Sequence, residues 1–440
     1  MTKSKFTVTL LATVLVAVFM LGLFGCDVGN KNIDTYPQNP DIDGGKSDNT
    51  DKLGVNPVQE LRTLAANGAL DFSAFADVDD SCLNSELSLP TDTATLDKTL
   101  AEQALVLCSG NGEDKTAQYL TKAGFEPSSI LHFNYRYNTG DDVRHTAAYS
   151  TAYKDVVYGG ETRTLIAVAV RGTNGNEWYA NFDFAPSHSD DTAFAENFLF
   201  AAQDLYLGVY GAISNKYSVI DSPIANPLFL VCGHSRGGAV ANLAALLLND
   251  KFGADNVFAY TFATPNTVHS DNEALGASNI FNFVYDCDFV PQMPLASWGY
   301  KRAGTDIALT CGDSDTVQRA TVQNVVSVLG QTATGIADYY TSRWSLTTDG
   351  KSANGVTPYE LMCALTSAVS GGLNNGDTDL GLSSFDDLSA NGHYAPLFKL
   401  LIGATQSPDK LLATINYHLP STYQKLLSAA LRHNVLNCKM

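Results

Sequence analysis

One short element, the G-x-S-x-G sequence of Gly233 to Gly237, constrains the fold more than any other part of this chain. The apolar run Leu228–Cys232 before it suits a buried strand, and Ala239–Leu248 after it suits a helix. A serine on such a sharp strand-to-helix turn is strained and presents its hydroxyl at the top of a sheet. Ser235 is therefore a candidate nucleophile. The alternative is a tight turn that carries a surface serine.

Strand-like and helix-like segments alternate along the chain. Strands are expected at Leu165–Val170, Val257–Phe262 and Ile280–Tyr285, and helices at Thr95–Leu107, Glu113–Lys122 and Phe198–Ile213. This alternation predicts an α/β fold with a mostly parallel central sheet flanked by helices. Functional residues gather at the carboxyl ends of such strands, where Thr173, Ser235 and Asp288 are expected to lie.

The charge balance limits the partners of the chain. The 440 residues include 27 Lys and Arg against 46 Asp and Glu, a formal net charge of −19. A chain without a basic surface has nothing to neutralise phosphates, so a nucleic-acid partner is excluded. Electrostatic docking on anionic membranes is disfavoured for the same reason. Nothing in the sequence indicates an oligomeric state.

The N-terminus has the pattern of a targeting segment. Lys3 and Lys5 precede an uncharged apolar run, Val8–Phe24, which ends shortly before Cys26. This resembles a bacterial lipoprotein signal, in which residues 1–25 are removed and Cys26 is lipidated. A small residue is usual where Phe24 stands, so ordinary secretion and an uncleaved anchor stay open as alternatives. Residues 26–57 are polar and predict a flexible tether, before a folded domain over 58–440.

A serine nucleophile needs a base and an orienting carboxylate. Serine alone is weakly nucleophilic at neutral pH, and hydrolases of this architecture follow the chain order Ser, Asp or Glu, His. Asp288 and Asp286 both follow the strand expected at Ile280–Tyr285. Strand periodicity does not choose between them, because residues two apart share a side of a strand.

Three histidines follow these carboxylates in the sequence. His433 falls in the middle of an expected terminal helix and is most simply a surface residue. His393 and His418 both fall in expected loops, and His418 lies just ahead of a helix. His234 is too close to Ser235 in the chain to turn back onto it, so we expect it to pack within the turn.

Four motifs together resemble the class 3 lipases, a family that includes fungal triacylglycerol lipases. They are Arg171-Gly172-Thr173, the Gly233–Gly238 element, Thr261-Phe262-Ala263-Thr264-Pro265 and Asp288-Phe289-Val290-Pro291, within roughly residues 115–310. The resemblance implies an α/β-hydrolase fold.

The resemblance also assigns roles at the site. It implies Ser235 as nucleophile, Asp288 as acid, and the N–H groups of Thr173 and Arg236 as oxyanion-hole donors. The family often shows His followed a few residues later by Tyr in a helix, and His418 with Tyr423 matches that pattern better than His393 does.

Some features depart from the family pattern. Arg236 stands where leucine is commoner, which predicts a more polar pocket mouth. The interval from Asp288 to His418 is longer than usual, which predicts a C-terminal insertion at about 311–390.

These observations predict a serine carboxylic-ester hydrolase that acts on lipid esters, most simply acylglycerols. The expected protein is exported and attached to the bacterial cell envelope through a lipid anchor. The reaction needs neither a metal nor an organic cofactor. A phospholipase or a non-lipid esterase is the alternative among enzymes, and a catalytically silent surface protein that binds a ligand is the alternative from another class.

Overall fold

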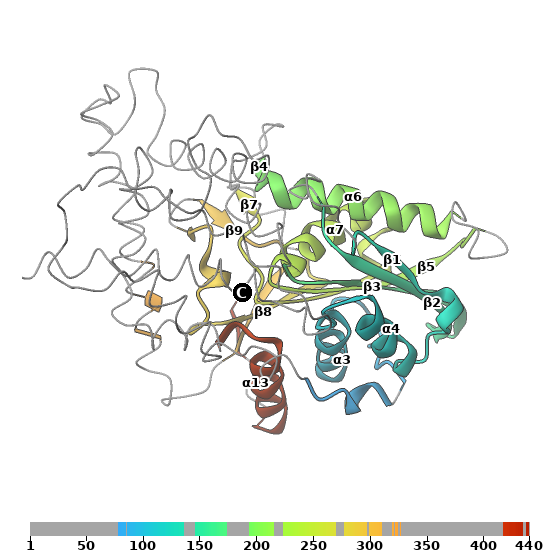
Figure 1. The fold of residues 1–440 in the computed structure, drawn as a ribbon, viewed down its shortest axis with the longest axis horizontal. Coiled ribbons are helices and arrows are strands. Elements are labelled where there is room, and N and C mark those ends of the chain that lie inside the picture. The colour runs from blue at the N-terminus through green and yellow to red at the C-terminus, as the bar shows by residue number, and fades with distance from the viewer. Residues whose placement is uncertain are drawn as a thin grey trace, which may run out of the picture.

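The computed structural model describes residues 78–84, 86–135, 146–173, 193–214, 223–269, 277–296, 299–309, 319–320, 322–323, 326, 417–433 and 437–439. These ranges form the coloured parts of Figure 1. The expected signal segment 1–25, Cys26, the tether 26–57, His393 and nearly all of the expected insertion 311–390 lie outside the described residues.

An eight-stranded sheet forms the centre of the described fold, with the strand order β1-β2-β3-β5-β6-β8-β10-β11. Strands β3, β5, β6, β8 and β10 pair in parallel, whereas the pairs that involve β1, β2 and β11 at the two edges are antiparallel. The predicted α/β fold with a mostly parallel central sheet is confirmed. The strands are β1 (Leu131–Phe133), β2 (Tyr149–Tyr158), β3 (Glu161–Val170), β5 (Pro227–His234), β6 (Val257–Phe262), β8 (Ile280–Tyr285), β10 (Thr305–Leu309) and β11 (Asn437–Lys439).

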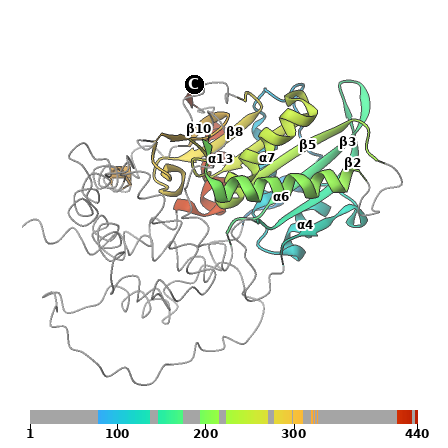
Figure 2. The same ribbon diagram turned by 90° about the horizontal axis from the view of Figure 1, so that it is seen from above.

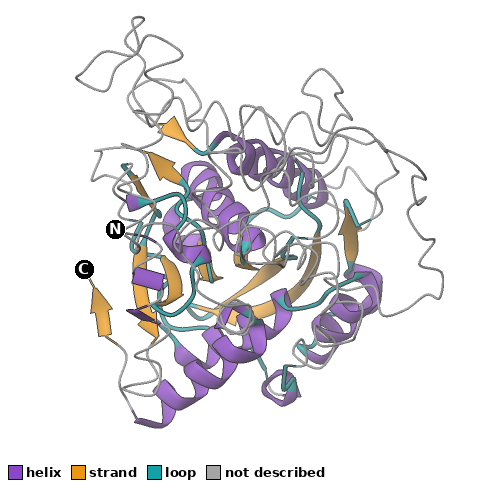
Figure 3. Cartoon of the chain, turned by 60° about the vertical axis from the view of Figure 1, so that its left-hand side comes forward, coloured by secondary structure: helices purple, strands orange, loops and turns teal. Residues whose placement is uncertain are grey.

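Helices cover both faces of this sheet, as Figures 1 and 3 show. Seen from above in Figure 2, α6 and α7 lie across one face. In β3, Val168 packs into the apolar cluster under α6 and α7, whereas Ala167 packs into the cluster formed with α3, α4 and α13. Because successive side chains of a strand point to opposite faces, a strand covered on both sides is apolar throughout. The helices are α3 (Lys98–Cys108), α4 (Glu113–Lys122), α6 (Glu196–Ile213), α7 (Arg236–Phe252) and α13 (Pro420–His433).

Most predicted elements recur with small changes at their ends. The predicted ranges of α4, β6 and β8 are confirmed, and α6, α7, β3 and β5 extend slightly beyond their predicted ranges. The hairpin of β2 and β3 is a structure that the sequence analysis missed. Its strands pair from Tyr149–Val170 to Tyr158–Glu161, and Gly159 and Gly160 form the turn with φ of 62° and 83°.

Short elements complete the described fold. A second sheet has three strands in the order β4-β7-β9, at Ala193–Phe194, Val268–His269 and Tyr300–Lys301. Short 3₁₀ turns occur at η2 (Ser81–Asn84), η3 (Pro127–Ser129), η4 (Ala254–Asn256) and η6 (Val290–Gln292).

Helix α13, near the C-terminus, is fixed by segments from the beginning of the described chain. The amide of Gln424 accepts a hydrogen bond from the N–H of Asp79 at 2.8 Å and donates to its carbonyl oxygen at 2.6 Å. The hydroxyl of Ser428 donates to the carboxylate of Glu102 in α3 at 2.8 Å. These contacts fix the helix that follows His418.

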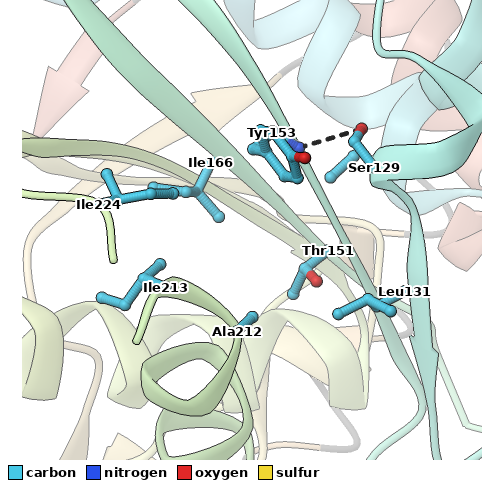
Figure 4. Close-up of a pocket in the computed structure, with 9 residues that line it drawn as sticks. Ser129, Leu131, Thr151, Tyr153, Ile166, Ala212, Ile213 and Ile224 are labelled. Carbon is cyan, nitrogen blue, oxygen red and sulfur yellow. Dashed lines mark hydrogen bonds between the residues drawn. The ribbon is translucent and has the colours of Figure 1, made fainter. Parts of the chain in front are cut away.

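A small cavity lies between β2, β3 and the C-terminal end of α6 (Figure 4). It is lined mainly by apolar side chains, including Ile166, Ile213 and Ile224, and has a volume of about 10 Å³. Ligand pockets are commonly about 300–1,000 Å³, so this cavity is not a substrate site. Among the described helices, none combines the length and the apolar content that crossing a bilayer requires.

Candidate active site

Ser235 lies between the end of β5 and the first residue of α7. Its backbone has φ 58° and ψ −128°, a combination that residues with a side chain rarely adopt. Such a conformation costs on the order of 1–3 kcal/mol and persists where the surroundings enforce it. A Cβ on Gly233 would overlap the carbonyl of Gly237, and one on Gly237 would lie 2.5 Å from the carbonyl oxygen of Arg171. The glycines therefore allow the tight turn that presents Ser235.

His418 lies between Ser235 and Asp288. Its Nε2 is 2.8 Å from the Ser235 Oγ, and its Nδ1 is 2.8 Å from the Asp288 Oδ2. An ionised carboxylate can only accept, so Nδ1 carries the imidazole proton and Nε2 accepts from the serine hydroxyl. This tautomer places the lone pair of the imidazole on the hydroxyl proton, which is the arrangement that general-base activation of serine needs.

Asp288 is fully buried and receives hydrogen bonds from three donors. Besides His418, the N–H of Val290 donates to Oδ1 at 2.9 Å and the hydroxyl of Tyr423 donates to Oδ2 at 2.8 Å. Burial and the charge of Asp288 raise the pKa of Tyr423 well above its usual value, so the phenol keeps its proton and donates. The three donors stabilise a carboxylate that has no access to water.

Asp286, the other candidate acid, faces a different partner. Its Oδ2 is 2.5 Å from the Nε of Arg319, and 43% of its side chain is exposed. Strand periodicity alone does not distinguish the two aspartates, but the turn after β8 directs them to different partners, Arg319 for Asp286 and His418 for Asp288. Of the other candidate bases, His433 is the last residue of α13, and its side chain is not among the described parts. His393 lies entirely outside the described residues.

One candidate oxyanion donor, Arg236, follows Ser235 in the sequence, and the other, Thr173, follows the end of the neighbouring strand β3. Strand β3 pairs in parallel with β5, with Val170 opposite Gly233, so Thr173 follows the strand end next to the turn. A Cβ on Gly172 would lie 4.0 Å from the Cβ of Ser235. The backbone N–H of Arg236 belongs to the first residue of α7, where the helix dipole favours negative charge.

The Arg236 side chain does not make the pocket mouth polar, so that prediction is wrong. The residue is only 1% exposed. Its guanidinium donates to the carbonyl oxygen of Thr146 at 2.9 Å and lies 5.6 Å from the centre of the Phe198 ring. A hydrogen bond and a cation–π contact with α6 hold this charge in the interior.

Arg302 stabilises the loop that carries Asp288 through hydrogen bonds. Its Nη1 donates to the carbonyl oxygens of Pro291, at 2.6 Å, and of Thr264, at 3.0 Å. Its Nε and Nη2 donate to the two carboxylate oxygens of Asp306 at 2.9 and 2.5 Å. The guanidinium of Arg302 therefore connects, through hydrogen bonds, the segment after β6, the loop that carries Asp288, and strand β10. No local pattern in the sequence marks Arg302 as part of the site.

His234 has a partner that the sequence analysis also missed. Its Nε2 lies 2.8 Å from the backbone carbonyl oxygen of His418. The residue is 5% exposed, as expected for packing within the turn, but its ring also contacts the candidate base. Its place next to Ser235 was the only signal in the sequence.

One part of this chain is similar to known proteins. Residues 167–298 match the model of the family described as lipase (class 3). A secreted mono- and diacylglycerol lipase A of Penicillium cyclopium is 29% identical over 186 residues, which cover 40% of this chain and 59% of that protein. A lipase of Rhizomucor miehei is 27% identical over 195 residues, which cover 41% of this chain and 52% of that protein.

A solved structure of a mono- and diacylglycerol lipase from Aspergillus oryzae is 20% identical, with a TM-score of 0.33, and the alignment covers 50% of this chain and 82% of that one. The chain spans between 52% and 59% of the length of the two curated relatives named above. The matched residues 167–298 include Thr173, Ser235, Arg236 and Asp288, while His418 lies beyond them. Residues 167–298 of this chain are therefore similar to the class 3 lipases.

Proposed function

We propose that this chain is a serine carboxylic-ester hydrolase that cleaves acylglycerols through an acyl-enzyme on Ser235. The observation that carries the proposal is the hydrogen-bonded series Ser235–His418–Asp288, with both distances at 2.8 Å. The similarity of residues 167–298 to class 3 lipases supports it.

The proposed reaction proceeds in two halves. The Ser235 Oγ attacks the ester carbonyl carbon while its proton passes to the Nε2 of His418. The N–H groups of Thr173 and Arg236 stabilise the oxyanion of the tetrahedral intermediate. His418 then protonates the leaving alkoxide as the C–O bond breaks, which leaves an acyl group on Ser235. A water oxygen then attacks the acyl carbon while His418 takes its proton. The bond between that carbon and the Ser235 Oγ breaks, and His418 returns the proton to Oγ, which releases the acid and restores the serine.

Asp288 has an electrostatic role in this scheme. Its carboxylate holds the Nδ1–H tautomer of His418 and stabilises the imidazolium that forms in each half-reaction. Because the carboxylate is buried, its interaction with the developing positive charge is screened little by water.

The proposed substrates are acylglycerols, because the relatives named above are a mono- and diacylglycerol lipase and a lipase. Hydrolysis of p-nitrophenyl esters of increasing chain length, together with mono-, di- and triacylglycerols, tests this. The proposal predicts turnover of both sets by the wild type and its loss in Ser235→Ala. Turnover of phospholipids or short esters alone would identify a phospholipase or a non-lipid esterase, and no turnover of any ester would indicate the silent binding protein.

The proposed location is the bacterial cell envelope, with the chain exported and lipidated at Cys26. The pattern of residues 1–26 supports this, and the Penicillium relative is named as secreted. Growth with labelled palmitate should label the wild type and not Cys26→Ser. Label that persists in the variant would refute lipidation at this cysteine.

A further inference from the structure

The residue that precedes the candidate nucleophile is in contact with the main chain of the candidate base. His234 is the last residue of β5, and its Nε2 lies 2.8 Å from the carbonyl oxygen of His418, 184 residues further along the chain. The two imidazole rings lie 4.9 Å apart, centre to centre, at an angle of 44°. Two neighbouring residues at the end of β5 thus contact His418: His234, the last residue of the strand, contacts its backbone, and Ser235, which follows the strand, contacts its side chain.

The acceptor determines which nitrogen of His234 carries the proton. A carbonyl oxygen can only accept, so Nε2 must be the donor. Burial and the neighbouring His418 lower the pKa of His234 well below its ordinary value. The ring therefore stays neutral, and it adds no positive charge beside an imidazole that must itself become positive during turnover.

The two ends of His418 are held by different groups. Asp288 and Ser235 hydrogen-bond to the two ring nitrogens. Hydrogen bonds to its nitrogens hold the His418 ring in place only while the backbone of His418 stays fixed. The hydrogen bond from His234 to the carbonyl oxygen of His418 fixes that backbone. Tyr423, which donates to Asp288, also packs edge-on against the His234 ring at 5.8 Å. His234 therefore contacts both the base and the tyrosine that supports the acid.

We propose that His234 is a positioning residue that fixes the backbone of His418 and so keeps its Nε2 within reach of the Ser235 hydroxyl. This inference rests on the proposed ester hydrolysis and adds a residue to it. A displacement of reacting groups by about 1 Å is enough to cost about 10²-fold in rate, so loss of the His234 donor should appear in turnover.

A matched pair of variants isolates the donor. In His234→Gln the amide nitrogen lies as many bonds from Cα as the Nε2 of histidine, and it can donate to the same carbonyl. In His234→Met the side chain is similar to glutamine in size and flexibility but has no hydrogen-bond donor. We expect His234→Met to lower kcat by about 10–10²-fold at an unchanged KM, and His234→Gln to recover to within about fivefold of the wild type. The rate at which a fluorophosphonate phosphonylates Ser235, with loss of fluoride, should fall in parallel.

A control variant accounts for the general loss of a buried hydrogen bond. The Tyr260 hydroxyl accepts from the N–H of Asp97 at 3.2 Å, and none of the described hydrogen bonds joins it to Ser235, His418 or Asp288. Tyr260→Phe should lower the melting temperature and leave kcat unchanged. If His234→Met behaves in the same way, or if His234→Gln and His234→Met lose turnover equally, the positioning role is wrong.

The test separates this inference from the proposed function. Wild-type protein that hydrolyses no ester contradicts the function itself, whereas active wild type with an equally active His234→Met contradicts only the role of His234. If His234→Met does not fold, nitrogen NMR of wild type labelled at histidine decides. A neutral Nε2–H tautomer of His234 supports the proposal, and an Nδ1–H tautomer overturns it.

Discussion

Asp288→Asn should abolish turnover while it leaves the fold intact. Both oxygens of Asp288 accept hydrogen bonds, Oδ1 from the N–H of Val290 and Oδ2 from His418 and Tyr423. Asparagine has only one side-chain oxygen. If this oxygen accepts from the N–H of Val290, the NH₂ group of the asparagine faces His418. The imidazole must then accept at Nδ1 and carry its proton on Nε2. A protonated Nε2 cannot accept the proton of Ser235.

The size of this effect follows from the change of tautomer. An equivalent carboxylate-to-amide change in a serine protease lowers kcat by about 10⁴-fold. At about 1.4 kcal/mol per tenfold change, this corresponds to about 5.5 kcal/mol of transition-state stabilisation. Because asparagine keeps the volume of the buried side chain, the melting temperature should change by only a few degrees.

The assay is kcat for p-nitrophenyl butyrate near neutral pH, with Asp286→Asn as the matched control. Asp286 pairs with Arg319 and makes no hydrogen bond to His418 among the described contacts, so its variant should keep wild-type turnover. Turnover by Asp288→Asn within about tenfold of the wild type, or a large loss in Asp286→Asn, would refute the reasoning.

Four further changes have expected outcomes. Tyr423→Phe removes one donor to Asp288 and should lower kcat by about 10–10²-fold, the equivalent of about 1.5–3 kcal/mol for a hydrogen bond to a charged group. Arg302→Gln leaves Asp306 without its cation and should lower the free energy of unfolding by about 3 kcal/mol, measured by urea titration. Gly237→Ala places a Cβ 2.5 Å from two carbonyl oxygens and should cost at least about 3 kcal/mol of stability, whereas Gly112→Ala meets no atom within 4 Å and should cost little. The lowered pKa of His234 means that the unfolded chain binds a proton which the folded chain does not, so stability should fall as pH drops below about 6.5, and this acid sensitivity should be smaller in His234→Gln.

Much of the central fold is predictable from the sequence because its signals are local. Fully buried strands are continuous apolar runs, and the turn at Ser235 needs glycine at defined positions, so β5, α7, β6 and β8 can be identified. The hairpin of β2 and β3 has a local signal as well, two glycines between two runs with β-branched residues. Strand β11 has no such signal, because three residues become a strand only by pairing with β10.

The site is predictable in its residue types and less so in its contacts. Ser235 follows from its motif, whereas the preference for His418 and Asp288 came from resemblance to a family. The contacts of His234 and Arg302 could not be predicted, because their partners include backbone carbonyls distant in sequence. Every residue has a carbonyl, so an acceptor of this kind leaves no mark in the sequence.

The most direct test of the account is the site at which a fluorophosphonate reacts. Mass spectrometry of the labelled, digested protein should find a single adduct, on the peptide that contains Ser235. The reaction should be absent in Ser235→Ala and slower by at least about 10²-fold in His418→Ala, the lower end for loss of a general base. Loss of labelling in His393→Ala with normal labelling in His418→Ala would contradict the account, as would an adduct on any residue other than Ser235.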